Sequence, residues 1–276
     1  MSEAYQTLKV DIRDAVMTVQ FAHPPINLMD RVMMQELRDL LVLLQEDKEI
    51  KVVLFKSANP DFFIAHADLG LFDGKIETPP PRSTKLNFIH RLFEGYRTLP
   101  KATIAVIEGR TNGAGTEFAL SLDMQFASLD AKIGQFEVAL GVLPGGTGTQ
   151  RLSWLMGRSR ALELILGCDE IDGRTAAEYG LVNRALPKRD LDAFVNALCA
   201  RIATFPLKAI ALAKMSVDAA LGDPTPALIE ESYLAGQLIV TDDVKTRFRR
   251  IFERGAQTVG GEMRMAELLT ELGDKP

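Results

Sequence analysis

Cysteine is scarce in this chain, which holds only Cys168 and Cys199 among its 276 residues. Two isolated thiols are too few for a disulfide framework, and they do not form a metal-binding motif. The formal net charge is −5 and the isoelectric point is near 5.4, so no basic surplus favours nucleic acid or an anionic membrane surface as a partner. An anionic ligand would therefore need a local basic patch.

Long apolar runs are also missing. No stretch of the sequence approaches the roughly 18 apolar residues of a membrane-spanning helix. Residues 1–6 lack the basic and apolar regions of a secretion signal. The hydrophobic fraction of 47% is ordinary for a folded protein, and the chain is long enough to bury a substantial core. We expect a cytoplasmic protein with neither a membrane nor a nucleic-acid partner.

Strand and helix patterns are interleaved in the first half of the chain. Residues 7–13 and 16–21 alternate as in a β-hairpin, with Asp14-Ala15 at the turn. Asp30 is placed to cap a helix whose apolar residues recur at helical spacing, and another helix is predicted from about residue 84 to 98. Further strands are predicted at residues 52–55, 103–107 and 124–128, with a helix at 113–122. Strands separated by helices are typical of βαβ units.

From about Gly148 onward the pattern is almost wholly helical. Helices are predicted at residues 149–156, 160–166, 175–180, 191–203, 207–221, 227–240 and 243–253. No internal repeat or low-complexity tract is present in the sequence. We expect an α/β core over residues 1–200, followed by a helical section over residues 201–276 that packs on the core or on a neighbouring subunit.

Small residues precede a carboxylate in the segment Gly113-Ala-Gly-Thr-Glu117, and Glu137 follows twenty residues later. Small residues let backbone N–H groups approach a carbonyl oxygen, and two carboxylates can move protons beside it. This combination suits an enzyme that makes enolates from thioesters. Taken singly, the glycines could serve tight packing and each glutamate could be a solvated surface residue.

A glycine-rich turn, Pro144-Gly-Gly-Thr-Gly148, comes shortly after Glu137. It lacks the Gly-Lys-Ser/Thr ending of a nucleotide phosphate loop. We therefore predict that this turn brings Glu137 to the site and starts the next helix.

The chain resembles the crotonase (enoyl-CoA hydratase/isomerase) superfamily over about residues 7–187. The residues that carry the resemblance are Phe136-Glu-Val-Ala-Leu-Gly-Val-Leu-Pro-Gly-Gly-Thr-Gly-Thr-Gln-Arg-Leu152, Gly157-Arg-Ser-Arg-Ala-Leu-Glu163 and Ala177-Glu-Tyr-Gly-Leu-Val-Asn183. The resemblance implies an α/β fold, a crotonase-like spiral of ββα units with a helical C-terminal trimerisation section. It also implies a homotrimer or dimer of trimers without a permanent cofactor or metal, in which coenzyme A is part of the thioester substrate.

The resemblance also implies roles for individual residues. Glu117 and Glu137 would be the catalytic acid/base pair, and the N–H groups of Ala67 and Ala114 would form an oxyanion hole. The residues expected to contact the substrate are Ile26, Leu28, Ala65, His66, Asp68, Leu69, Gly113 and Leu140. The implied reaction is hydration of a trans-2-enoyl-CoA through a stabilised enolate. Alternatives are a double-bond isomerase, a CoA-thioester hydrolase that uses His66, and a crotonase-fold binding protein without turnover.

His66 departs from the family pattern, which usually has glycine at this position. Histidine is one of the residues enriched at positive φ, so we expect it to replace glycine in the same backbone geometry. The alternative is an imidazole that donates a hydrogen bond or carries a proton beside the hole. His23 and His90 have no recognisable partner, and we expect them to be surface or packing residues.

Two other departures concern the binding of coenzyme A and of the acyl group. The basic residue often found before Asn27 is replaced by Pro24-Pro25, and Lys101 is one substitute for binding the phosphates. The other is a basic cluster made of Lys245, Arg247, Arg249 and Arg250, which is more simply a solvated helix face. Residues 243–254 do not follow the family pattern, so the resemblance does not imply an acyl group.

Overall fold

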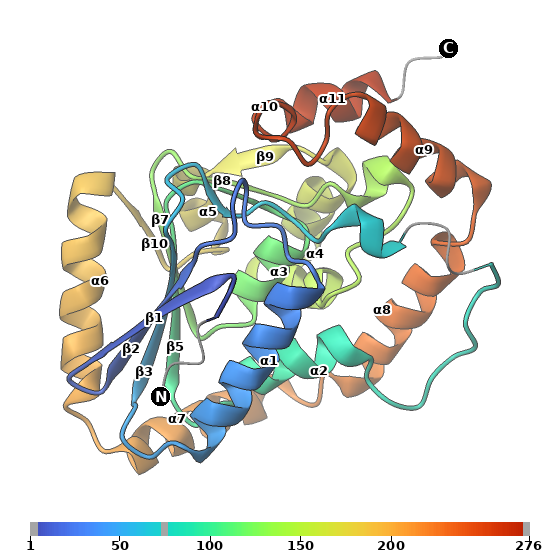
Figure 1. Ribbon diagram of the computed structural model, residues 1–276. Coiled ribbons are helices and arrows are strands. Elements are labelled where there is room, and N and C mark those ends of the chain that lie inside the picture. The colour runs from blue at the N-terminus through green and yellow to red at the C-terminus, as the bar shows by residue number, and fades with distance from the viewer. Residues whose placement is uncertain (1–4, 73–76, 273–276) are drawn as a thin grey trace.

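The computed structural model describes residues 5–72 and 77–272, so residues 1–4, part of the segment tested above for a secretion signal, lie outside it. A six-stranded sheet has the order β1-β2-β3-β5-β7-β10 (Figure 1). Its strands are β1 (Leu8–Arg13), β2 (Val16–Phe21), β3 (Val52–Ser57), β5 (Ala102–Ile107), β7 (Met124–Ser128) and β10 (Arg184–Leu186). The predicted hairpin of β1 and β2 is confirmed, and the remaining pairs in this sheet are parallel.

A second sheet of short strands lies beside the first. It has the order β4-β6-β8-β9 and consists of β4 (Phe62–Ile64), β6 (Arg110–Asn112), β8 (Lys132–Gly134) and β9 (Glu170–Asp172). The chain gives one strand to each sheet in turn, as β3 and β4, β5 and β6, then β7 and β8, and each pair is followed by a helical segment. This succession is the expected spiral of ββα units.

Capping residues and glycines determine where the helices of the core begin and where they break. They are α1 (Arg31–Glu46), α2 (Phe88–Arg97), α3 (Ala114–Leu120), α4 (Gly148–Gly167) and α5 (Gly173–Tyr179), with 3₁₀ turns η1 (Leu69–Phe72) and η2 (Glu137–Leu140). Asp30 caps α1 as predicted, since its side chain accepts from the N–H of Met33. α2 begins at Phe88, later than predicted, because the Asn87 side chain caps it there. α4 is broken at Gly157, where φ is +77°, into the two predicted segments.

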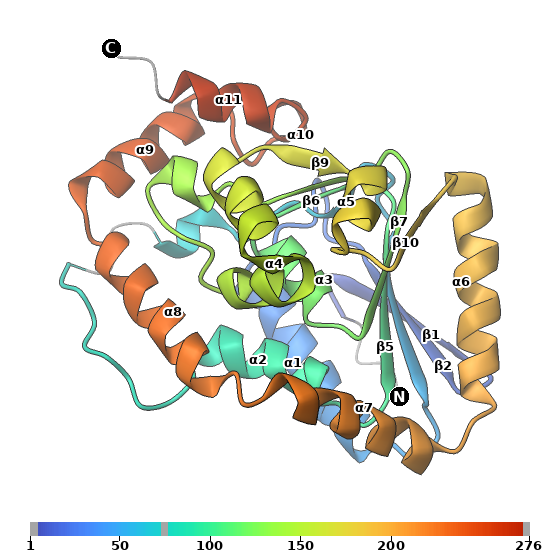
Figure 2. The same ribbon diagram turned by 180° about the vertical axis from the view of Figure 1, so that it is seen from behind.

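The C-terminal part is helical, as expected. It consists of α6 (Lys188–Ala203), α7 (Leu207–Leu221), α8 (Thr225–Leu238), α9 (Asp242–Glu253), α10 (Val259–Glu262) and α11 (Met265–Glu271). Seen from behind, α6 covers the outer face of the six-stranded sheet, whereas α8 to α11 wrap the opposite side of the molecule (Figure 2). No single helix in the described ranges is long and apolar enough to cross a membrane; α6 and α7 pass that test only as a pair, bent by 108°. The division near residue 200 stays a prediction.

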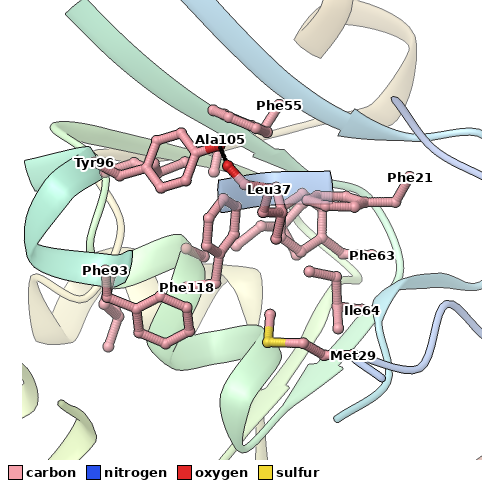
Figure 3. Packing of buried hydrophobic residues seen from close by; sticks show 14 of the residues in the cluster. Phe21, Met29, Leu37, Phe55, Phe63, Ile64, Phe93, Tyr96, Ala105 and Phe118 are labelled. Atoms are coloured by element: carbon pink, nitrogen blue, oxygen red, sulfur yellow. Dashed lines mark hydrogen bonds between the residues drawn. The ribbon is translucent and has the colours of Figure 1, made fainter. Parts of the chain in front are cut away.

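An aromatic cluster fixes the position of α3. The ring of Phe118, which is fully buried, meets Phe21, Phe55, Phe93 and Tyr96 at centroid distances of 5.2–5.8 Å, close to perpendicular in most pairs (Figure 3). Edge-to-face pairs of this kind stabilise by about 0.5–1.5 kcal/mol each beyond their buried area. The Tyr96 hydroxyl also donates to the carbonyl of Leu37 on α1 at 2.7 Å. The contacts of Phe118 therefore anchor α3, the helix that carries Glu117, to the aromatic core.

Candidate active site

A cavity of about 450 Å³ lies between the α/β core and helices α8 and α9. Its walls come from η1, α2, the start of α3, η2, the glycine-rich turn and the C-terminal helices, and they are mostly apolar. The polar side chains that line it are His66, Asn87, Glu117, Glu137 and Ser232. Six residues of the predicted site also line it in addition to the two glutamates: His66, Ala67, Leu69, Gly113, Ala114 and Leu140.

The N–H group of Ala67 points away from Met29, the residue with which Ala67 pairs. Met29 forms an isolated parallel bridge with Ala67, in which the Met29 N–H donates to the His66 carbonyl at 2.9 Å and the Asp68 N–H donates to the Met29 carbonyl at 3.1 Å. In such a bridge the flanking residues make the hydrogen bonds, so the N–H and C=O of Ala67 both face the other side. Among the hydrogen bonds of the described residues, the Ala67 N–H has no acceptor.

The N–H group of Ala114 is free for a different reason. Ala114 is the first residue of α3, and the first N–H groups of a helix have no intrahelical acceptor. The described part of the chain provides no other acceptor for it. Both Ala67 and Ala114 line the cavity, so two residues with unpaired backbone donors border the same space. The N-terminus of α3 adds partial positive charge there.

Glu117 is bound by the glycine-rich turn. Its Oε1 accepts from the N–H groups of Gly146 and Gly148, each at 2.8 Å. A Cβ atom at Gly146 would lie 2.5 Å from Oε2, and one at Gly148 would lie 2.7 Å from Oε1, so only glycine permits this approach. The prediction that the turn brings Glu137 to the site is wrong: its N–H groups hold Glu117 instead.

Glu137 begins η2 and its carboxylate lies against Gly113. A Cβ atom at Gly113 would lie 2.6 Å from Glu137 Oε1, and Gly113 also has φ of +49°, which favours glycine. The other oxygen, Oε2, is buried without a hydrogen-bond partner. An unpaired buried carboxylate oxygen that faces a cavity is a group poised for a ligand.

Burial makes both carboxyl groups hold protons more strongly. Burial raises the pKa of Glu137 to about 7, although the nearby His66 opposes this. Burial, and then the charges of Glu137 and Glu231, raise the pKa of Glu117 well above its usual value against the two N–H donors. With a pKa of about 7, Glu137 is partly protonated near neutral pH. One carboxyl can act as an acid while the other acts as a base, as pairs of unequal pKa do in acid–base enzymes.

Glu231 of α8 is a buried carboxylate that the sequence analysis missed. It accepts from the N–H of Thr147 at 2.7 Å and of Thr149 at 3.1 Å, and its Oε1 lies 3.1 Å from His90 Nε2. The expectation that His90 has no partner is therefore wrong. His23 also has one, since its Nε2 lies 2.9 Å from Asp30 Oδ2. The sequence signal for Glu231 was weak, because Glu231 is one of two adjacent glutamates in Leu228-Ile-Glu-Glu-Ser-Tyr-Leu234.

His66 does not fill the backbone role predicted for it. It is absent from the residues with positive φ, so it does not replace glycine for conformational reasons. Its ring is 2% exposed, with Nδ1 at 2.7 Å from the Ala67 carbonyl oxygen and Nε2 at 3.1 Å from Glu262 Oε1. Burial lowers the pKa of His66, but the hydrogen bond and charge of Glu262 outweigh burial, so the pKa is raised overall.

Four predicted substrate contacts lie beside the cavity and do not line it. Ile26 and Ala65 are buried in a small apolar cluster with Phe62, on which Leu28 packs. Asp68 accepts from the N–H of Gly70 and from the Gln257 side chain, each at 2.9 Å. Their contact with the pantetheine or nucleotide stays a prediction.

Lys101 is unsuited to the phosphate role considered for it. The side chain is 1% exposed, and its ammonium group donates to the carbonyls of Asp47 and Ile50 at 2.9 and 2.6 Å. In the basic cluster, Arg247 pairs with Asp243 at 2.9 Å and donates to the carbonyl of Ala139 at 2.9 Å. Arg247 therefore ties α9 to η2.

Two free backbone donors and two buried carboxyls around one apolar cavity define a class of enzyme, one that moves protons next to an acyl carbonyl. The enoyl-CoA hydratase/isomerase family model matches residues 11–258. The chain belongs to this family, and it is an enzyme of the enoyl-CoA hydratase/isomerase type with the crotonase fold. The match extends well beyond the residues that carried the resemblance.

Individual relatives agree with this assignment. The chain is 29% identical over 231 residues to a short-chain-enoyl-CoA hydratase of Clostridium acetobutylicum, which covers 83% of this chain and 87% of that protein. A crystal structure of a candidate enoyl-CoA hydratase from Streptomyces avermitilis is 34% identical with a TM-score of 0.91, and covers 99% of this chain and 100% of that one. An enoyl-CoA hydratase from Mycobacterium avium is 25% identical with a TM-score of 0.79, covering 90% and 96%.

Proposed function

We propose that this enzyme hydrates a trans-2-enoyl-CoA. The N–H groups of Ala67 and Ala114 would bind the thioester oxygen and stabilise the enolate, while Glu117 and Glu137 exchange protons with water and with the α carbon. The observation that carries the proposal is the convergence of both free N–H groups and both buried carboxyls on one cavity. Each carboxyl contributes roughly a hundred- to ten-thousandfold to such reactions, and each oxyanion donor about a hundred- to thousandfold.

The apolar walls of the cavity support a hydrocarbon acyl group. Phe72, Phe88, Phe136 and Phe248 line it together with aliphatic side chains that include Leu69, Leu140 and Val142. A cavity of about 450 Å³ accommodates the acyl part and the thioester but not the nucleotide, which would lie outside it. A short or medium acyl chain is therefore the proposed substrate.

The test is turnover of short and medium trans-2-enoyl-CoA substrates, followed by loss of the conjugated absorbance. Glu117→Gln and Glu137→Gln should each lower kcat by roughly a hundredfold or more. Glu36→Gln is the matched control, because Glu36 is a carboxylate on α1 that accepts from the N–H groups of Gln6 and Thr7 away from the cavity. Absence of turnover by the unmodified protein would refute hydration.

Isomerisation is tested in the same experiment. A double-bond isomerase needs only one carboxyl to cycle a proton, so Glu137→Gln would then retain conversion of a 3-enoyl-CoA into its 2-enoyl isomer. The hydrolase alternative has less support, because both ring nitrogens of His66 already have hydrogen-bond partners.

Assembly into a trimer or a dimer of trimers is part of the proposal. α7 has no buried residue in the single chain, and its apolar side chains Leu212, Met215, Val217 and Leu221 are all more than half exposed. An apolar helix face of this kind is typical of a subunit interface.

A further inference from the structure

The two nitrogens of the His66 ring both face hydrogen-bond acceptors. Nδ1 lies 2.7 Å from a carbonyl oxygen, that of Ala67, and Nε2 lies 3.1 Å from a carboxylate oxygen, that of Glu262. A carbonyl oxygen cannot donate, so Nδ1 carries a proton, and Nε2 carries one as well when Glu262 is ionised. The geometry therefore describes a buried imidazolium paired with a buried carboxylate.

Glu262, the partner of His66, is buried and held in place by a hydrogen bond from the backbone. Its Oε1 accepts a second hydrogen bond, from the N–H of Gln257 at 2.7 Å, and its side chain is 1% exposed. The loop before α10 is tight, since a Cβ atom at Gly261 would lie 1.9 Å from the carbonyl oxygen of Gly255. This loop holds Glu262 in one place relative to the core.

A second contact ties the same C-terminal loop to the segment that carries Ala67. The Gln257 amide donates to Asp68 Oδ1 at 2.9 Å, next to the His66–Glu262 pair. Met265, Leu268 and Leu269 of the following segment pack with Leu69 and Phe136 in one apolar cluster. The C-terminal section is therefore bonded to residues on both sides of the Ala67 peptide.

His66 and Glu137 meet at Gly113. A Cβ atom built on Gly113 would have as its nearest neighbours Glu137 Oε1 at 2.6 Å and His66 Cβ at 3.7 Å. The other charged or titratable groups around them are Glu117 on α3, Glu231 on α8, Cys168 after α4 and Arg247 on α9. Of these neighbours, His66 lowers the pKa of Glu137 and Glu231 raises it.

We propose that His66 is a positioning residue: held as an imidazolium between Glu262 and the Ala67 carbonyl, it fixes the peptide that follows Ala67, and so restrains the backbone that carries the Ala67 N–H, and it keeps the negative charge of the carboxyl pair on Glu137. The orienting part rests on the proposed function, because it gives the Ala67 N–H a task. The effect of His66 on the charge of Glu137 does not rest on the proposed function, since it concerns the protein without substrate. His66 itself touches no reacting atom in this scheme, as neither ring nitrogen is free.

The protonation state of His66 is measured without substrate. The chain has only three histidines, so ¹⁵N spectra of the ring nitrogens resolve into His23, His66 and His90, with His66→Gln as the assignment. We expect both His66 nitrogens to be protonated at pH 7. A single protonated nitrogen on His66 at pH 7 would overturn the proposal.

The titration midpoint of Glu137 is measured in protein with ¹³C-labelled glutamate carboxyls, and the signal that disappears in Glu137→Gln is assigned to this residue. The pH dependence of kcat/KM gives a second measure. An opposite charge a few ångströms away lowers a carboxyl pKa by roughly 1–3 units, so removing it should raise the Glu137 midpoint by about one unit or more. His66→Gln should give the larger shift, because it leaves Glu262 as an anion, and Glu262→Gln a smaller one in the same direction. The double variant keeps an amide pair in place of the ion pair and guards against loss of folding.

The matched control is Asp123→Asn, which breaks another ion pair between the core and a C-terminal helix. Lys214 of α7 lies 2.8 Å from Asp123 Oδ2, outside the cavity, so this variant should leave the Glu137 midpoint unchanged. A uniform fall in kcat with an unmoved midpoint in all His66 and Glu262 variants would mean a purely structural role. If the protein hydrates no enoyl-CoA, the proposed function fails, while the carboxyl titration still decides the charge on Glu137.

Discussion

Gly113→Ala tests whether the placement of Glu137 limits the reaction. The added Cβ would lie 2.6 Å from Glu137 Oε1, whereas ordinary contacts begin at 3.4 Å, so the carboxylate must move by about 0.8 Å. A misplacement of roughly 1 Å lowers the rate of an enzyme by about a hundredfold. The residue also has φ of +49°, and holding alanine there destabilises the fold by about 1–3 kcal/mol. Proteins are commonly stable by about 5–15 kcal/mol, so the variant should still fold.

Gly157→Ala is the matched control for this variant. Gly157 also has positive φ, +77°, but a Cβ atom there meets nothing within 4 Å. Both variants should lose stability in urea unfolding, and only Gly113→Ala should lose kcat with a trans-2-enoyl-CoA. If Gly113→Ala keeps the kcat of Gly157→Ala while it is destabilised as much, the carboxylate is not displaced and the reasoning fails.

Three further measurements test other parts of the structure. The pKa of Glu137 is raised to about 7 and the carboxyl is neutral below it, so kcat/KM should fall about tenfold for each pH unit below that value; a profile flat down to pH 5 would contradict this assignment. Phe118→Ala should lower the free energy of unfolding by about 3–5 kcal/mol in urea titrations, and a loss below about 1 kcal/mol would show that the aromatic cluster adapts. Met215→Glu should shift sedimentation toward smaller species without destabilising the single chain; an unchanged sedimentation coefficient would place any interface elsewhere.

Local signals predicted much of the fold. The alternation in residues 8–21 gave the hairpin, the Asp30 cap gave the start of α1, and the apolar period gave α7 with its observed bounds. The strands of the second sheet were missed because three residues are too few to show a period of two. They form because neighbouring turns of the spiral supply their hydrogen-bond partners, and this information is not local.

The sequence likewise predicted only part of the candidate site. Glu117, Glu137 and the alanines that line the cavity follow from motifs, so the sequence could identify them. The partners that brace these residues are distant in sequence: Glu231 lies 84 residues beyond Thr147, and Glu262 lies 196 residues beyond His66. No pattern of spacing predicts such pairs, and this is why His66 was expected to serve the backbone.

The bracing carboxylates have a consequence for the order in which the site forms during synthesis. Glu231 and Glu262 lie on helices α8 and α10, near the end of the described chain, and they complete the glycine-rich turn and the Ala67 segment. A chain that is still emerging from the ribosome lacks both, because domains fold as their residues become available. Such a chain has its α/β core, Glu117 and Glu137 but not the carboxylates that hold their surroundings, so the proposed site is complete only after α10 has been made.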